Sequence, residues 1–232
     1  NLTCEGMASR CAADRVLFLH GYTQNGQVFK SRCSTLAKLV KASKDSLFPD
    51  APHACRADQS SDERPLEDQR AWFSPAEPDP AIRPAHSKKY IGWKESLCQL
   101  QALVDQQPGP FAGIVSFSQG APLAALLCAS RPNSFSYGVF VGGFLPGDLE
   151  AVEELQRLLA GSELSMPTLH VVGTADPFVT LDAAKALQAL FSGNSSFLTH
   201  DGGHILPPNS LKSEIRDFMT QVATASNARP AH

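Results

Sequence analysis

The sequence lacks the features that mark a membrane-spanning or nucleic-acid-binding protein. No run approaches the roughly eighteen apolar residues that a membrane-spanning helix needs, and the first residues contain no apolar signal-peptide core. The net charge is only −3 and no long basic segment is present, so there is no electrostatic reason to expect nucleic acid as a partner. We therefore expect a soluble, cytoplasmic protein without a membrane span, whose substrate is a small molecule.

The cysteines show neither a metal-binding nor a redox pattern. Six are present, at irregular spacings. None of them forms a C-x-x-C pair, and such pairs are typical of zinc sites and dithiol redox centres. We expect reduced, structural cysteines and no metal site.

Short apolar runs alternate with amphipathic segments along most of the 232 residues, of which 43% are hydrophobic. Apolar runs too short for a core helix are typical of buried parallel strands. Their alternation with helices predicts an α/β fold with a mainly parallel central sheet and helices on both faces. The expected strands cover residues 15–20, 46–53, 113–117, 137–144, 168–173 and 196–200, and the expected helices lie near residues 28–40, 93–104, 121–127, 149–159, 187–191 and 211–222.

We expect a single domain over residues 14–224, an N-terminal extension at 1–13 that is partly disordered, and a short tail at 225–232. Charged residues and prolines dominate residues 56–89, which predicts a surface insertion over the active site. An aromatic pair inside this insertion, Trp72 and Phe73, either forms a pocket wall or lid, or anchors the loop on the core. The candidate substrate-binding residues are Trp72, Phe73 and Phe178.

The strongest functional signal lies in residues 113–127, where an apolar run, a turn with Ser118 at its apex and an Ala/Leu-rich helix follow one another. This is the strand–turn–helix arrangement of a nucleophile elbow. A serine hydroxyl becomes a good nucleophile only when a base takes its proton, so it must stand where a histidine can reach it. Gly120 is the small residue expected after the serine, whereas Ser116 replaces the glycine that is usual two positions before it.

Ser118, Asp176 and His204 follow the order nucleophile, acid, base that α/β-hydrolases use, and each comes just past an expected strand. Because the carboxyl ends of parallel strands meet at one edge of the sheet, we expect a catalytic triad. Asp176 would fix the tautomer of His204, which would take the Ser118 proton. Two alternatives stay open: His200 as the base, although it lies inside an expected strand, and Asp201 as the acid.

Two backbone amides are candidates for an oxyanion hole. The N–H of Gln119 directly follows the nucleophile at a helix start, and the N–H of Tyr22 follows a strand end at His20 and Gly21. We expect His20 itself to hold this loop rather than to take part in the chemistry.

Several motifs together resemble the FSH family of serine hydrolases, of the ovarian-cancer-associated gene 2 type, over about residues 14–220. They are residues 18–25, 50–53, 70–73, 109–120, 141–144 and 200–204. The resemblance implies an α/β-hydrolase fold, no metal or organic cofactor, and hydrolysis of carboxylic esters or thioesters through an acyl-enzyme. It also implies Ser118 as nucleophile, Asp176 as acid and His204 as base. An acyltransferase or polyketide-releasing thioesterase is the nearest alternative, and a catalytically silent binding module is an alternative from another class.

Overall fold

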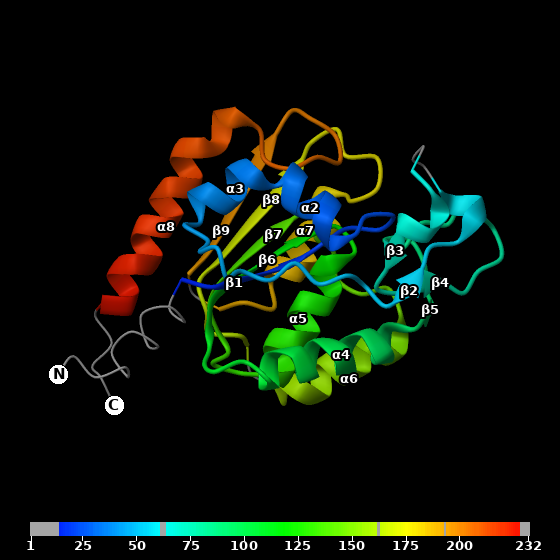
Figure 1. The fold of residues 1–232 in the computed structure, drawn as a ribbon, viewed down its shortest axis with the longest axis horizontal. Helices are drawn as coiled ribbons and strands as arrows, with labels where there is room; N and C mark the ends of the chain where they lie inside the picture. Colours follow the sequence, from blue (N-terminus) through cyan, green and yellow to red (C-terminus); the bar gives the residue numbers. More distant parts are fainter. Residues whose placement is uncertain (1–13, 61–63, 162, 193, 228–232) are drawn as a thin grey trace.

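A parallel sheet of five strands forms the centre of the molecule (Figure 1). The structure is a computed structural model, and it describes residues 14–60, 64–161, 163–192 and 194–227. All four strand pairings are parallel and β6 and β8 are almost wholly buried, as expected for a sheet covered on both faces. The strand order is β1 (Val16–Leu19), β6 (Phe111–Phe117), β7 (Phe135–Val141), β8 (Thr168–Gly173) and β9 (Ser195–His200).

Helices cover the two faces of the sheet, and each face has its own hydrophobic cluster (Figure 1). One layer consists of α4 (Trp93–Asp105), α5 (Gly120–Ser130), α6 (Leu149–Leu159) and α7 (Leu181–Gln188). The other layer consists of α2 (Gly26–Arg32), α3 (Ser34–Leu39) and α8 (Lys212–Asn227). The expected α/β architecture, with a mainly parallel sheet between two helical layers, is confirmed.

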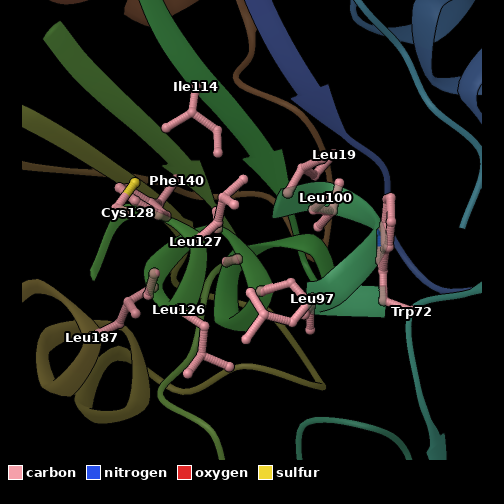
Figure 2. Close-up of a cluster of buried hydrophobic side chains, with 14 of the residues drawn as sticks. Leu19, Trp72, Leu97, Leu100, Ile114, Leu126, Leu127, Cys128, Phe140 and Leu187 are labelled. Atoms are coloured by element: carbon pink, nitrogen blue, oxygen red, sulfur yellow. The ribbon is translucent and has the colours of Figure 1, made fainter. Parts of the chain in front are cut away.

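Helix α5 is the most deeply buried helix of the first layer, because every residue from Gly120 to Ala129 is buried. Figure 2 shows its leucine side chains among those of α4, α7 and the sheet. A helix that is apolar on all sides must lie inside the protein. Since α5 begins directly after Ser118, its burial fixes the position of the turn that carries this serine.

Some boundaries differ from the expected ones. The expected helix at 28–40 is two helices that meet at Cys33, whose backbone (φ −92°, ψ 14°) departs from helical geometry. Of the expected strand at 46–53, only a bridge between Leu47 and Leu17 remains beside the central sheet, and His53 begins a short strand that pairs elsewhere. Strand β7 ends at Val141 because Gly142 adopts φ +54°, outside the extended region.

The chain ends lie largely outside the described residues. Helix α8 continues to Asn227, into the expected tail at 225–232. The rest of that tail and the expected extension at 1–13 are not among the residues that the structure describes.

The described residues of the insertion and of the segments that flank it form two short two-stranded sheets and two 3-10 turns. One sheet pairs β2 (His53–Ala54) with β3 (Arg70–Ala71), and the other pairs β4 (Ser74–Pro75) with β5 (Tyr90–Ile91). The insertion lies beside the loop that follows β1, because the amide of Thr23 donates to the carbonyl of Arg70 and that of Arg70 donates to the carbonyl of Gln24. It therefore packs on the edge of the sheet where the strands end (Figure 1).

Two buried histidines are neutral parts of this framework. The amide of Ala51 donates to Nε2 of His20 at 3.0 Å, so Nδ1 carries the proton and donates to the Gly21 carbonyl at 2.8 Å. Burial lowers the pKa of His20 to about 4. Burial also lowers the pKa of His170 to about 3, where its ring lies 5.0 Å from that of Phe140.

We expect the free energy of unfolding to decrease as the pH falls from about 6.5 to about 4. In this range both imidazoles take up protons in the unfolded chain but stay neutral in the folded protein, and the loss from His20 alone is about 3 kcal/mol. Urea unfolding at a series of pH values measures the slope. His170→Leu should flatten it, and an unchanged slope in this variant would contradict the expectation.

Candidate active site

The turn between β6 and α5 presents Ser118 in a strained backbone conformation. Its φ is +52°, in the left-handed region that residues other than glycine rarely adopt. Two hydrogen bonds hold it there: the amide of Ser118 donates to the carbonyl of Val141, and the amide of Ala121 donates to the carbonyl of Ser118, each at 2.9 Å. This is the geometry expected of a nucleophile elbow.

The residues beside the serine are small because the turn packs tightly against the end of β1. A Cβ on Gly120 would lie 2.6 Å from the carbonyl oxygen of Leu19, which is too close for any side chain. Ser116 is accommodated inside β6, opposite Leu19, with its side chain fully buried and no hydrogen-bond partner for its hydroxyl. The serine at this position is therefore compatible with the turn.

Asp176 and His204 are joined by a hydrogen bond of 2.6 Å between Oδ2 and Nδ1. Because a carboxylate only accepts, Nδ1 carries the proton and Nε2 is left able to accept one. The other carboxylate oxygen of Asp176 accepts from the amides of Phe178 and Val179 at 2.8 and 2.9 Å. Burial alone would raise the pKa of Asp176, but the hydrogen bond from His204 and these two amides outweigh burial and hold the pKa below its ordinary value.

The imidazole of His204 is enclosed on three sides. Its ring centroid lies 4.9 Å from that of Phe117 and 5.4 Å from that of Phe178. On the third side, a Cβ at Gly142 would lie 2.9 Å from Cε1 of the imidazole, so only glycine leaves room for the ring. These contacts fix the ring independently of a substrate.

Ser118 and His204 line one cavity of about 220 Å³. Among the described residues no hydrogen bond joins the two side chains, and such contacts often become shorter only when substrate binds. Phe178 lines the same cavity, and so do residues 83–85 of the insertion. Residues 83–85 lie in a segment without a recognisable motif, so the sequence alone gives no reason to single them out.

Two backbone amides at this cavity donate to none of the described residues. They are the N–H groups of Tyr22, whose residue lines the cavity, and of Gln119, next to Ser118. Gln119 is also the N-cap of α5, where the helix dipole adds partial positive charge. The two amides are therefore available to an anionic oxygen.

Trp72 and Phe73 lie in the core, with only 1% and 0% of their surfaces exposed, and neither lines the cavity. Figure 2 shows Trp72 within the hydrophobic cluster. Of the two alternatives for this pair, the structure favours the anchor on the core over the pocket wall. The physical reason is hydrogen bonding: the Trp72 amide donates to Oε1 of Gln119 and its indole N–H donates to the carbonyl of His20, each at 2.8 Å. The Gln119 side chain in turn donates to the carbonyl of Phe73. The pair anchors the insertion on the elbow and on the loop after β1.

The two alternative triad residues occupy other positions. Nδ1 of His200 accepts from the amide of Gly202 at 3.1 Å, and the ring is buried in β9 without lining the cavity. Asp201 is exposed, and among the hydrogen bonds of the described residues the carboxylate that His204 contacts is that of Asp176. Geometry thus favours Asp176 and His204 over both alternatives.

Within the described ranges, no group of three or more His, Cys, Asp or Glu side chains is placed to hold a metal ion. The cysteines in this part of the chain, Cys33, Cys55, Cys98 and Cys128, are free thiols. In the same ranges no helix is both long and apolar enough to span a bilayer.

Comparison with known proteins identifies the family. A model of the family described as serine hydrolase (FSH1) matches residues 8–215. The chain belongs to the serine hydrolase (FSH1) family. Esterase OVCA2 of Danio rerio is 33% identical over 223 residues, which cover 88% of this hydrolase and 96% of the relative. Esterase CG5412 of Drosophila melanogaster is 32% identical over 206 residues, which cover 86% of this hydrolase and 71% of the relative. The expected class, a serine hydrolase of the esterase type, is confirmed.

Solved structures confirm the α/β-hydrolase fold of this FSH1-family member. Arabidopsis thaliana SOBER1 superposes with a TM-score of 0.62 at 21% identity, covering 90% of this chain and 98% of that one. Esterase PE8 gives a TM-score of 0.65 at 20% identity and covers 91% and 93% of the two chains. Zea mays acyl-protein thioesterase 2 gives 0.59 at 19% identity, with 90% and 94% covered.

We expect Asp176→Asn to lower kcat for p-nitrophenyl butyrate by roughly 10³- to 10⁴-fold, because an asparagine amide can hold the imidazole in the wrong tautomer. Asp201→Asn is the matched control, and we expect its kcat to stay within about twofold of wild type because Asp201 is exposed. Steady-state kinetics at neutral pH measure both. An equal loss in the two variants would contradict the role given to Asp176.

Proposed function

We propose that this protein hydrolyses carboxylic esters or thioesters of small molecules through an acyl-enzyme formed on Ser118. The observation that carries the proposal is the hydrogen bond between Asp176 and His204, made in the wall of the cavity that Ser118 also lines. The esterase names of the family relatives support ester substrates. One structural neighbour is named an acyl-protein thioesterase, which supports testing thioesters as well.

In acylation, Oγ of Ser118 attacks the carbonyl carbon while Nε2 of His204 takes the hydroxyl proton. The imidazolium that forms is stabilised by the carboxylate of Asp176, which remains ionised because its pKa is held low. The tetrahedral intermediate then expels the alcohol or thiol, which leaves with the proton from His204. The product is an ester between the acyl group and Ser118.

In deacylation, a water molecule replaces the leaving group. His204 takes a proton from this water, whose oxygen attacks the acyl carbon, and the second tetrahedral intermediate releases the carboxylic acid as Ser118 regains its proton. The same two amides, of Tyr22 and Gln119, would bind the oxyanion in both steps, because neither donates to a described residue.

Trp72 connects the two segments that would supply the oxyanion hole, the loop of Tyr22 and the turn of Gln119. Its amide donates to the side chain of Gln119, and its indole N–H donates to the carbonyl of His20, two residues before Tyr22. A hydrogen bond from Ser96 to the Trp72 carbonyl ties the same residue to α4. We therefore assign Trp72 a positioning role without contact with substrate.

We expect Trp72→Phe to lower kcat by about 3- to 10-fold, the range for one lost hydrogen bond, with KM little changed. The ring remains but the indole N–H that holds the His20 carbonyl is lost. Trp93→Phe is the matched control, since Trp93 is buried in the same cluster and, among the described residues, its indole N–H donates no hydrogen bond to either amide-bearing loop. The split between kcat and KM, measured on p-nitrophenyl butyrate, decides whether Trp72 acts on the transition state. An equal fall of kcat in both variants would show a merely structural effect.

We expect Ser118→Ala to abolish hydrolysis of p-nitrophenyl esters from acetate to palmitate, with a loss of about 10⁴-fold or more. The wild-type protein should also be labelled covalently by a fluorophosphonate probe, and the variant should not. Matched thioesters in the same series measure the preference for the leaving group, and added alcohols detect acyl transfer. Activity that survives Ser118→Ala, or a wild-type protein that is neither labelled nor active, would refute the proposal.

A further inference from the structure

Two arginine side chains lie in the wall of the cavity beside Ser118. Arg32 and Arg83 line it, and none of the described residues that line it is an aspartate or glutamate. A ligand cavity is usually apolar with a few placed polar groups. Positively charged side chains in a cleft attract anionic ligands and raise their local concentration.

Arg83 is held in a defined position within this wall. Its guanidinium donates to the carbonyl of Gln59 at 2.8 Å, and its Cζ lies 5.8 Å from the ring centroid of Phe178. Among the described residues it forms no ion pair with a carboxylate. A guanidinium has several N–H donors arranged as a planar fork, so most of them are available to a ligand in the cavity.

A single aromatic ring separates this guanidinium from the catalytic imidazole. The ring is that of Phe178, which contacts Arg83 on one side and lies 5.4 Å from the ring of His204 on the other. An anionic group bound at Arg83 would therefore lie a short substrate chain away from a carbonyl placed at Ser118. The cavity of about 220 Å³ is also smaller than the roughly 300–1,000 Å³ typical of sites for drug-sized ligands, which favours a compact anion.

We propose that the preferred substrate is a compact ester that carries a carboxylate, which Arg83 binds while Ser118 attacks the ester carbonyl. This inference rests on the proposed ester hydrolysis and names its substrate class. Arginine suits the task because its fork matches both oxygens of a carboxylate, and such charge-assisted pairs are the stronger hydrogen bonds.

The test compares esters that differ only in charge. On the acyl side, p-nitrophenyl hemiglutarate is compared with p-nitrophenyl valerate; on the leaving-group side, a nitrophenyl butyrate with a ring carboxylate is compared with p-nitrophenyl butyrate. In one of the two pairs we expect kcat/KM for the anionic ester to exceed that for its neutral partner by about tenfold or more. The pair that shows this preference identifies whether the acyl group or the leaving group of the substrate carries the carboxylate. The preference should decrease with added salt, because salt screens charges near the surface.

Substitutions at Arg83 assign the preference to one side chain. In Arg83→Gln the ratio of kcat/KM for the anionic ester to that for its neutral partner should fall by about tenfold or more, and Arg83→Lys should retain part of it. Arg157→Gln is the matched control, because Arg157 is an exposed arginine on α6 that pairs with Glu154, away from the cavity. It should leave both the ratio and the activity unchanged. Equal rates for charged and neutral esters, or an unchanged ratio in Arg83→Gln, would overturn the inference.

A binding measurement separates this inference from the proposed function. Ser118→Ala, which is expected to bind without turnover, should bind p-nitrophenyl hemiglutarate or the ring-carboxylated ester more tightly than its neutral partner by calorimetry. Ser118-dependent hydrolysis without any charge preference would overturn the substrate class and leave the ester hydrolysis standing. Tighter binding of an anionic ester by a wild-type protein that hydrolyses none would support the anion site and refute the hydrolysis.

Discussion

The close contact between the end of β1 and the turn after β6 is the constraint on which the site depends. A Cβ at Gly120 would collide with the carbonyl of Leu19, and one at Gly21 would lie 2.8 Å from the ring of Phe117. Neither position leaves space for a side chain, so two segments far apart in the sequence can approach as closely as backbones allow. This approach places the amides of Tyr22 and Gln119 near one another, at the end of the sheet where Ser118 emerges.

The insertion is part of this framework, because buried polar groups of the elbow depend on it. The side chain of Gln119 is fully buried. A buried side-chain amide without hydrogen-bond partners would lower the free energy of unfolding, because it loses its hydrogen bonds to water and gains none in the protein. Backbone groups of Trp72 and Phe73 satisfy both ends of it. The nucleophile turn and the insertion therefore form one hydrogen-bonded unit, which explains why a polar segment contains two fully buried aromatic rings.

The sequence predicted those parts of the fold and site that are encoded locally. The short apolar runs identified all five strands of the parallel sheet. The position of Asp176 and His204 just past two of these strands predicted that they lie close together, and the two side chains are hydrogen-bonded. Choosing His204 over His200 required only that one follows β9 and the other lies within it. The contact between Asp176 and His204 could be predicted because strand ends in a parallel sheet converge whatever the connecting segments do.

The parts that were mispredicted depend on contacts that no local pattern records. Trp72 and Phe73 are surrounded in the sequence by charged residues and prolines, so composition favours a loop at the surface, whereas their burial follows from hydrogen bonds to Gln119 and His20. Arg83 could not be singled out, because an arginine in a polar insertion is ordinary until the fold places it beside Phe178. The break between α2 and α3 at Cys33 has no glycine or proline to announce it.

The negative and positive charges of the site lie on opposite sides of the His204 imidazole, and this arrangement links the proposed chemistry to the proposed substrate. The carboxylate of Asp176 is almost fully buried behind the imidazole of His204. In the proposed mechanism its negative charge stabilises the imidazolium, while its depth keeps that charge away from the cavity. In front of the imidazole, the amino end of α5 and Arg83 present positive charge to the cavity. The cavity side of the imidazole thus favours two negative charges of the proposed substrate. One develops on the carbonyl oxygen during the reaction, and the other is the permanent charge of the carboxylate. If Asp176 faced the cavity directly, it would repel both, so the depth of this one carboxylate is as important to the site as its hydrogen bond.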